Sequence, residues 1–263
     1  MLKKLLKYDF KSTTKSLLPF YGIIILLSAL VRVTGIVKDH FPITKFIYAM
    51  MLVLFVIAIV AIVLYTFLVA IRHFYKTVLK DEGYLTHTLP VKRNHIILSQ
   101  TITALIFFLI SCITILIALF ISFYSKGAIK TIFTTLNEIF KAMETNPTIG
   151  YTYIIIIGLV GYMSYVLIFY LSLILGHQKS KNKLIYSFIY GLIIYSIIQV
   201  LSFISLGVAI LFDHNIINVM NDASATFKDM ASVLISSGVL SCMIPFACYF
   251  ISCKAINTKL NLE

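Results

Sequence analysis

The sequence predicts an all-α polytopic membrane protein with six transmembrane helices. Of its 263 residues, 60% are hydrophobic and only 12% are charged, whereas an ordinary soluble domain is about one quarter charged. A soluble fold of this composition would leave large apolar patches exposed to water. The apolar residues also gather into runs of the length that a spanning helix needs, about 20 residues. We therefore predict one membrane domain over residues 1–263.

The chain opens with a basic segment that precedes the first apolar run. Within residues 1–16, four apolar side chains (Leu2, Leu5, Leu6 and Phe10) fall roughly on one side of a helix among five lysines. A basic helix with one apolar face is suited to lie in the plane of a membrane surface. We predict an N-terminal amphipathic interfacial helix here, and the alternative is an ordinary basic flank of the first span.

Six apolar runs follow, and each is long enough to cross a bilayer. The longer runs have room to tilt or to continue as helix beyond the hydrocarbon. Small residues that allow close approach of membrane helices occur in the fourth span, at Gly158 and Gly161, and in the sixth, at Ser232, Ser236, Ser237 and Ser241. The predicted spans cover residues 17–37, 46–71, 96–124, 151–176, 184–212 and 231–253.

Basic residues near the span ends predict the orientation. With the N-terminus inside, 15 of the 22 lysines and arginines fall on the cytoplasmic side, as positive residues prefer. Both termini are therefore predicted to be cytoplasmic. Anionic lipid accounts for these lysines, and no basic face carries the interleaved aromatic residues of a single-strand binder. Membrane lipid is expected as a partner and nucleic acid is not.

One amphipathic segment lies outside the predicted spans. Residues 128–144 carry apolar side chains at helical spacing opposite polar ones. Under the predicted orientation, this segment is an extracellular helix. It would lie on the membrane or cap the exit of a pore.

The sequence contains no motif for catalysis or metal binding, so no catalytic residue and no metal ligand is predicted. The phosphate-binding pattern G-x-x-x-x-G-K-[ST] is absent, and the four cysteines lack metal-like spacing. The six histidines are expected to be titrating surface residues. The interiors of spans two to six contain no Asp, Glu, Lys, Arg or His, although ion and proton pathways usually require such groups. Transport against a gradient would therefore draw its energy from a separate subunit.

The longest basic polar interruption, Arg72–His95, separates the second and third spans. It holds an acid, a glycine and a leucine at Glu82, Gly83 and Leu85, followed by Thr88–Pro90 and an apolar helix. This segment resembles the corresponding loop of ABC-2 type permeases, the membrane subunits of bacterial ATP-driven exporters. The six spans and the basic N-terminal segment agree with the short form of these permeases found in low-GC Gram-positive bacteria.

The resemblance implies that this loop is a coupling helix, an elbow that docks on a cytoplasmic ATPase subunit. The residues themselves favour such an elbow, because Gly83 permits the geometry that ends a helix and Pro90 suits the first turn of the next. The alternative is a solvated loop that only reverses the chain. The docking residues would be Lys80, Asp81, Glu82, Gly83, Tyr84 and Leu85, with Thr88 and Pro90 in the return turn.

The resemblance also implies partners and a path. A second permease copy or a sister permease would pair with this chain in the bacterial cell membrane, and two ATPase copies would bind ATP and Mg²⁺. This chain would then be a transport subunit without a cofactor or an ATPase site of its own. Spans two and five from two copies would line a path for a peptide, an antibiotic or a lipid-like molecule, through Phe55, Tyr65, Tyr195, Gln199 and Phe203.

Other interpretations remain open at this stage. The aromatic residues and Gln199 also suit ordinary helix packing, since side-chain amides bond across membrane helices. The whole chain is also compatible with a substrate-binding membrane module of an ATP-driven importer, which would bind its ligand without nucleotide. An intramembrane enzyme would need a polar constellation inside the spans, and the sequence shows none.

Overall fold

The computed structural model describes residues 2–38, 41–80, 83, 93–124, 128–142, 146–179, 181–212 and 231–258. Within these ranges the chain forms helices and no strand. Six of the helices are long and apolar enough to cross a membrane, and each of them overlaps one predicted span. The prediction of an all-helical, multi-pass membrane protein is therefore confirmed for the described part of the chain.

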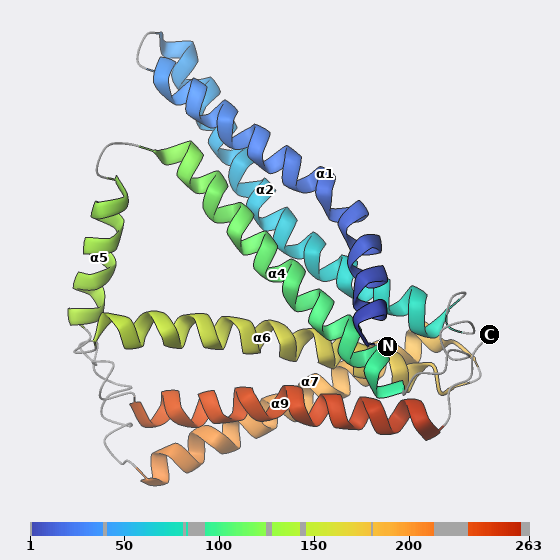
Figure 1. Cartoon of the computed structure of the whole chain (residues 1–263). Helices are drawn as coiled ribbons and strands as arrows, with labels where there is room; N and C mark the ends of the chain where they lie inside the picture. Colours follow the sequence, from blue (N-terminus) through green and yellow to red (C-terminus); the bar gives the residue numbers. More distant parts are fainter. Residues whose placement is uncertain are drawn as a thin grey trace. The chain divides into compact units, whose positions relative to one another are not determined.

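Figure 1 shows the helices in their order along the chain. The element η1 is a π-helix that continues α2 without a break. The bounds are α1 Leu2–Val37, α2 Pro42–Phe74, η1 Tyr75–Leu79, α4 Arg93–Phe123, α5 Ala128–Ala142, α6 Pro147–Gly176, α7 Lys183–Phe212 and α9 Ala231–Thr258.

The N-terminal segment differs from the expected division into an interfacial helix and a span. Helix α1 is continuous over 36 residues, with Pro19 inside it. Its ribbon bends within the dark-blue N-terminal part (Figure 1). A proline in a helix lacks the N–H that would bond to the residue four positions earlier, and kinks usually occur at such sites. An interfacial location of residues 1–16 stays a prediction.

The chain divides into two compact units. The first unit contains residues Met1–Lys76 and Leu98–Lys130, and the second contains Thr77–Ile97 and Thr131–Glu263. In the first unit, α1 and α2 lie side by side and run in opposite directions (Figure 1). In the second unit, α6 packs against both α7 and α9, and α7 packs against α9.

A seven-residue repeat holds the core of the first unit together. Leu17, Ile24 and Val31 are buried on α1 at intervals of seven, and Phe55, Ile62 and Val69 repeat in the same way on α2. Phe107 and Ala118 of α4 complete the two clusters that these residues form. Apolar residues spaced by seven are typical of long helices that pack along a common seam. The sequence repeat thus explains why α1 and α2 associate, and Phe107 and Ala118 add α4 to their core.

Small residues bring the helices of the second unit together. A Cβ built on Gly176, the last residue of α6, would lie 2.5 Å from the backbone nitrogen of Ser187 and 2.6 Å from its Cα. Helix α7 begins after a turn in which Asn182 has a positive φ of 52°. Only glycine at position 176 allows the two backbones to approach so closely.

The predicted packing role of Gly158 and Gly161 is wrong for this single chain. No atom lies within 4 Å of a Cβ built on either glycine. Most buried residues of α6 lie from Ser164 onward. The buried residues of α6 therefore concentrate in its second half, and the space directly beside these two glycines is open.

Candidate functional site

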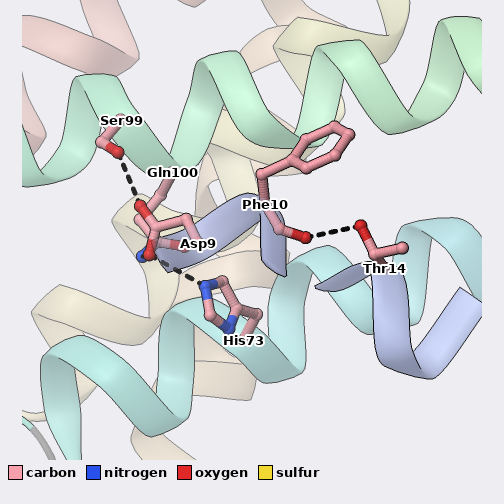
Figure 2. Close-up of polar contacts among 6 residues, drawn as sticks. All are labelled: Asp9, Phe10, Thr14, His73, Ser99 and Gln100. Carbon is pink, nitrogen blue, oxygen red and sulfur yellow. Dashed lines mark hydrogen bonds and ion pairs between the residues drawn. The ribbon is translucent and has the colours of Figure 1, made fainter. Parts of the chain in front are cut away.

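A buried carboxylate forms the most elaborate polar site in the described part of the chain. Asp9 of α1 is only 8% exposed. Its Oδ1 accepts hydrogen bonds from Nε2 of His73 at 3.1 Å and from Nε2 of Gln100 at 2.9 Å. Its Oδ2 accepts a bond from Oγ of Ser99 at 2.6 Å. Figure 2 shows the Asp9 carboxylate between Ser99 and His73, and we refer to these four residues as the carboxylate cluster.

The three donors come from the two other helices of the first unit. His73 belongs to the last turn of α2, and Ser99 and Gln100 are neighbours near the start of α4. An ionised carboxylate accepts hydrogen bonds and donates none. The bond from His73 therefore requires that its Nε2 carries the proton. With this tautomer, every group that faces Asp9 in these bonds is a donor.

The hydrogen bonds of the carboxylate cluster are suited to hold α1, α2 and α4 together. Burying a charge is unfavourable unless hydrogen bonds compensate for the lost water. Here both oxygens of Asp9 accept bonds from the protein itself. Removing one partner of such a group leaves a buried charge with fewer donors, which is far less favourable than the intact arrangement. Among the described residues, no group of three His, Cys, Asp or Glu side chains is placed to hold a metal ion.

The sequence did not predict this cluster, although it contains one signal for it. Asp9 lay in a segment treated as a surface helix, and the histidines were expected at the surface. That expectation is wrong for His73, and also for His177, which is buried with Nδ1 2.8 Å from the carbonyl of Leu173. His73 follows Thr66 by seven residues, and Thr66 is a buried residue of α2. The repeat that buries Thr66 thus predicts that His73 faces inward.

A second polar junction joins the same three helices near their middle. The hydroxyl of Tyr21 lies 2.9 Å from Oγ of Ser111, and Oγ1 of Thr66 lies 2.8 Å from the same oxygen. Ser111 of α4 thus connects α1 with α2. A third junction lies beyond it, where Arg32 donates to the carbonyl of Tyr124 and stacks over its ring at 5.9 Å.

The structure describes only part of the predicted docking elbow. The expected helical continuation of span two is present, since η1 carries the helix from Tyr75 to Leu79. Lys80 is exposed, and the amide of Gly83 donates to the carbonyl of Lys80 at 2.7 Å. The other predicted residues lie outside the described part of the chain: Asp81, Glu82, Tyr84, Leu85, Thr88 and Pro90.

The predicted path residues fall into two groups, one in each unit. Phe55 is 1% exposed within the core of the first unit, and Tyr65 stacks on Phe20 with ring centroids 4.0 Å apart. On α7, Nε2 of Gln199 donates to the hydroxyl of Tyr195 at 2.8 Å, because a spacing of four residues places both side chains on one face of the helix. This pair and Phe203 are exposed on α7.

Comparison with known proteins identifies no relative. No protein-family model, no curated protein and no solved structure matches this chain.

Proposed function

We propose that this chain is the permease subunit of an ATP-driven exporter of the ABC-2 type in the bacterial cell membrane. The observation that carries the proposal is the loop between α2 and α4, with its acid, glycine and leucine at Glu82, Gly83 and Leu85 and the turn that ends in Pro90. A separate ATPase, in two copies, would bind ATP and Mg²⁺ and dock on Lys80–Leu85. A second permease copy or a sister permease would complete the path.

The length of the second span supports a helix that extends beyond the membrane. The apolar helix from Pro42 to Leu79 has 38 residues, whereas about 20 residues cross the hydrocarbon. At a rise of about 1.5 Å per residue, the excess is long enough to carry Lys80 and the elbow away from the bilayer. With both termini cytoplasmic, that extension points toward an ATPase.

The cargo follows from the residues that would line the path. Tyr195, Gln199 and Phe203 offer aromatic rings and one amide on a helix with few buried residues. Ligand sites are mostly apolar with a few polar groups that set the orientation. We propose that the path carries a hydrophobic or amphipathic molecule, such as a peptide, an antibiotic or a lipid-like compound.

Co-purification tests the proposal directly. Tagged chain, expressed in its own host, is expected to retain an ATPase subunit. The double variant Glu82→Arg with Leu85→Asp is expected to lose that subunit, because the change reverses a charge and places a second charge at an apolar anchor. Lys181→Glu is the matched control, since Lys181 is an exposed basic residue in the turn between α6 and α7, on the same predicted side of the membrane.

Two outcomes would contradict the exporter. The first is that no ATPase accompanies the wild-type chain, or that the double variant retains it as well as wild type does. The second is tight binding of a ligand by the isolated chain in the absence of nucleotide, together with uptake rather than efflux in cells. That result would favour the importer module instead.

A further inference from the structure

The carboxylate cluster lies near the end of α2 and the start of α4, on either side of the loop that the proposed function assigns to ATPase docking. We call these two helix ends the roots of the elbow. His73 is the last but one residue of α2 and precedes η1 by two positions. Ser99 and Gln100 lie near the start of α4, the helix that follows the loop. The two helices on either side of the elbow therefore both donate to one carboxylate, and that carboxylate comes from α1.

On the basis of the proposed function, we propose that Asp9 is a positioning residue that locks the N-terminal part of α1 to both roots of the elbow. When the elbow moves, α2, α4 and α1 then move together at this end. Without Asp9, the ends of α2 and α4 that flank the elbow can move separately, and motion at Lys80–Leu85 no longer reaches α1, α2 and α4 as one displacement.

Burial makes this connection stronger than an exposed ion pair. Hydrogen bonds to a charged acceptor in a low-dielectric site are about twice as strong as neutral ones. A network of several such bonds also exceeds the sum of its pairs. Because three donors converge on Asp9, separating either α2 or α4 from α1 breaks at least one hydrogen bond to this buried carboxylate. The connection is therefore expected to hold or release as a unit.

The position of the π-helix adds a second reason to expect motion at this point. Single π-helical turns inside α-helices occur often at functional sites. Here η1 lies between His73 and Lys80, with Val78 and Leu79 buried. The irregular turn thus connects a fixed point, the carboxylate cluster, with the proposed docking residues. A displacement of the elbow is therefore transmitted through η1 to the carboxylate cluster.

Hydrogen–deuterium exchange of the full chain in lipid nanodiscs tests the lock without any partner. In Asp9→Asn, an NH₂ group replaces one of the two carboxylate oxygens. This NH₂ group then faces side chains that are themselves donors, so at least one hydrogen bond is lost. We expect exchange about tenfold faster or more, the equivalent of about 1.4 kcal/mol, in peptides from residues 2–16, 70–80 and 93–102. Thr13→Val is the matched control, because Oγ1 of Thr13 is buried one turn further along α1 without a partner among the described residues.

The pattern of exchange decides the outcome. Faster exchange in 2–16 alone would overturn the inference, because the two roots would then not depend on Asp9. Equal acceleration in α6 and α7 would also overturn it, since the effect would be general destabilisation. These results require no ATPase, so they are independent of whether the proposed function is correct.

A second measurement examines transmission to the partner. In the complex with its ATPase, Asp9→Asn is expected to lower substrate transported per ATP hydrolysed several-fold, with basal hydrolysis retained. His73→Gln keeps an N–H donor for Asp9, so we expect it to retain most of the substrate transported per ATP. His73→Leu removes the donor, so we expect this ratio to fall. An unchanged ratio in Asp9→Asn and His73→Leu would overturn the role of the lock in coupling.

Discussion

The two units of this protein hold their helices together by different means. In the first unit, side chains from α1, α2 and α4 bond to one another at the carboxylate cluster and again around Ser111. In the second unit, small residues let backbones approach, as at Gly176, and polar side chains bond to backbone carbonyls. Examples are Tyr153 to Leu234 at 3.0 Å and Gln178 to Ala255 at 3.1 Å.

This difference shows two solutions to one physical problem. Between helices in a bilayer, apolar surface provides no net driving force, because lipid tails are as apolar as the side chains. Side-chain networks specify a register through particular donors and acceptors, and they can be released by changing one group. Close backbone packing depends on the absence of a side chain, and any added atom disrupts it. The polar contacts of the first unit can thus be released by changing one side chain, whereas the close approach of α6 and α7 in the second unit tolerates no added atom.

The largest effect on stability is expected from a substitution that disrupts helix packing in the second unit. Gly176→Val places side-chain atoms against the backbone of Ser187, and backbone cannot move aside as a flexible side chain can. We expect a loss of about 3 kcal/mol in the free energy of unfolding, at the upper end for overpacking, and a low yield of folded protein. Gly158→Val in the same helix is the control and should remain near wild type, because nothing lies within 4 Å. Equal thermal stability of the two variants in detergent would refute this account.

The next effect weakens the first unit at the carboxylate cluster. Ser99→Ala removes the donor to Oδ2 of Asp9, and we expect a loss of about 2 kcal/mol, as for hydrogen bonds to charged groups. Thr103→Val is its control, since Oγ1 of Thr103 is buried one turn further along α4 without a partner in the described structure. Thermal unfolding in nanodiscs measures both. If Thr103→Val is as destabilising as Ser99→Ala, then volume matters here rather than the hydrogen bond.

A smaller effect is expected at the middle junction. Ser111→Ala removes the oxygen shared by Tyr21 and Thr66, and bonds between membrane helices are worth about 0.6 kcal/mol on average. We expect a loss of about 1 kcal/mol in unfolding free energy. Ser202→Ala should change nothing measurable, because the exposed Ser202 hydroxyl bonds only within its own helix, to Ile198. A Ser111→Ala variant with unchanged stability would show that this junction does not hold the unit.

The smallest effect on overall stability is expected from a substitution at the contact between α5 and α6. A Cβ on Gly150 would lie 2.3 Å from the ring of Phe140, so Gly150→Ala should displace that ring while leaving α6, α7 and α9 in contact. We expect faster proteolysis or hydrogen exchange in residues 128–142 with almost no change in the melting temperature. Gly161→Ala, with no neighbouring atom within 4 Å, is the control. A large drop in melting temperature would mean that α5 is part of the rigid packing.

Much of the fold could be predicted from the sequence, and part of the site could not. The six apolar runs correspond to the six long helices, and the shared face of Tyr195 and Gln199 follows from their spacing of four. Asp9 was missed because a lone acid among five lysines suggests a solvated surface. Gly158 and Gly161 were misinterpreted because a single sequence does not show which part of a helix its neighbours cover.

By itself, the sequence determined that this chain crosses a membrane as helices and approximately where each helix lies. That information is local, since a run of apolar residues must satisfy its backbone hydrogen bonds within the segment, and only a helix does so in a single strand of chain. The tertiary structure alone decided which polar side chains meet. Asp9, His73 and Ser99 are far apart in sequence, and their bonds exist only because the seven-residue repeats of α1 and α2, together with Phe107 and Ala118 of α4, bring the three helices into one unit.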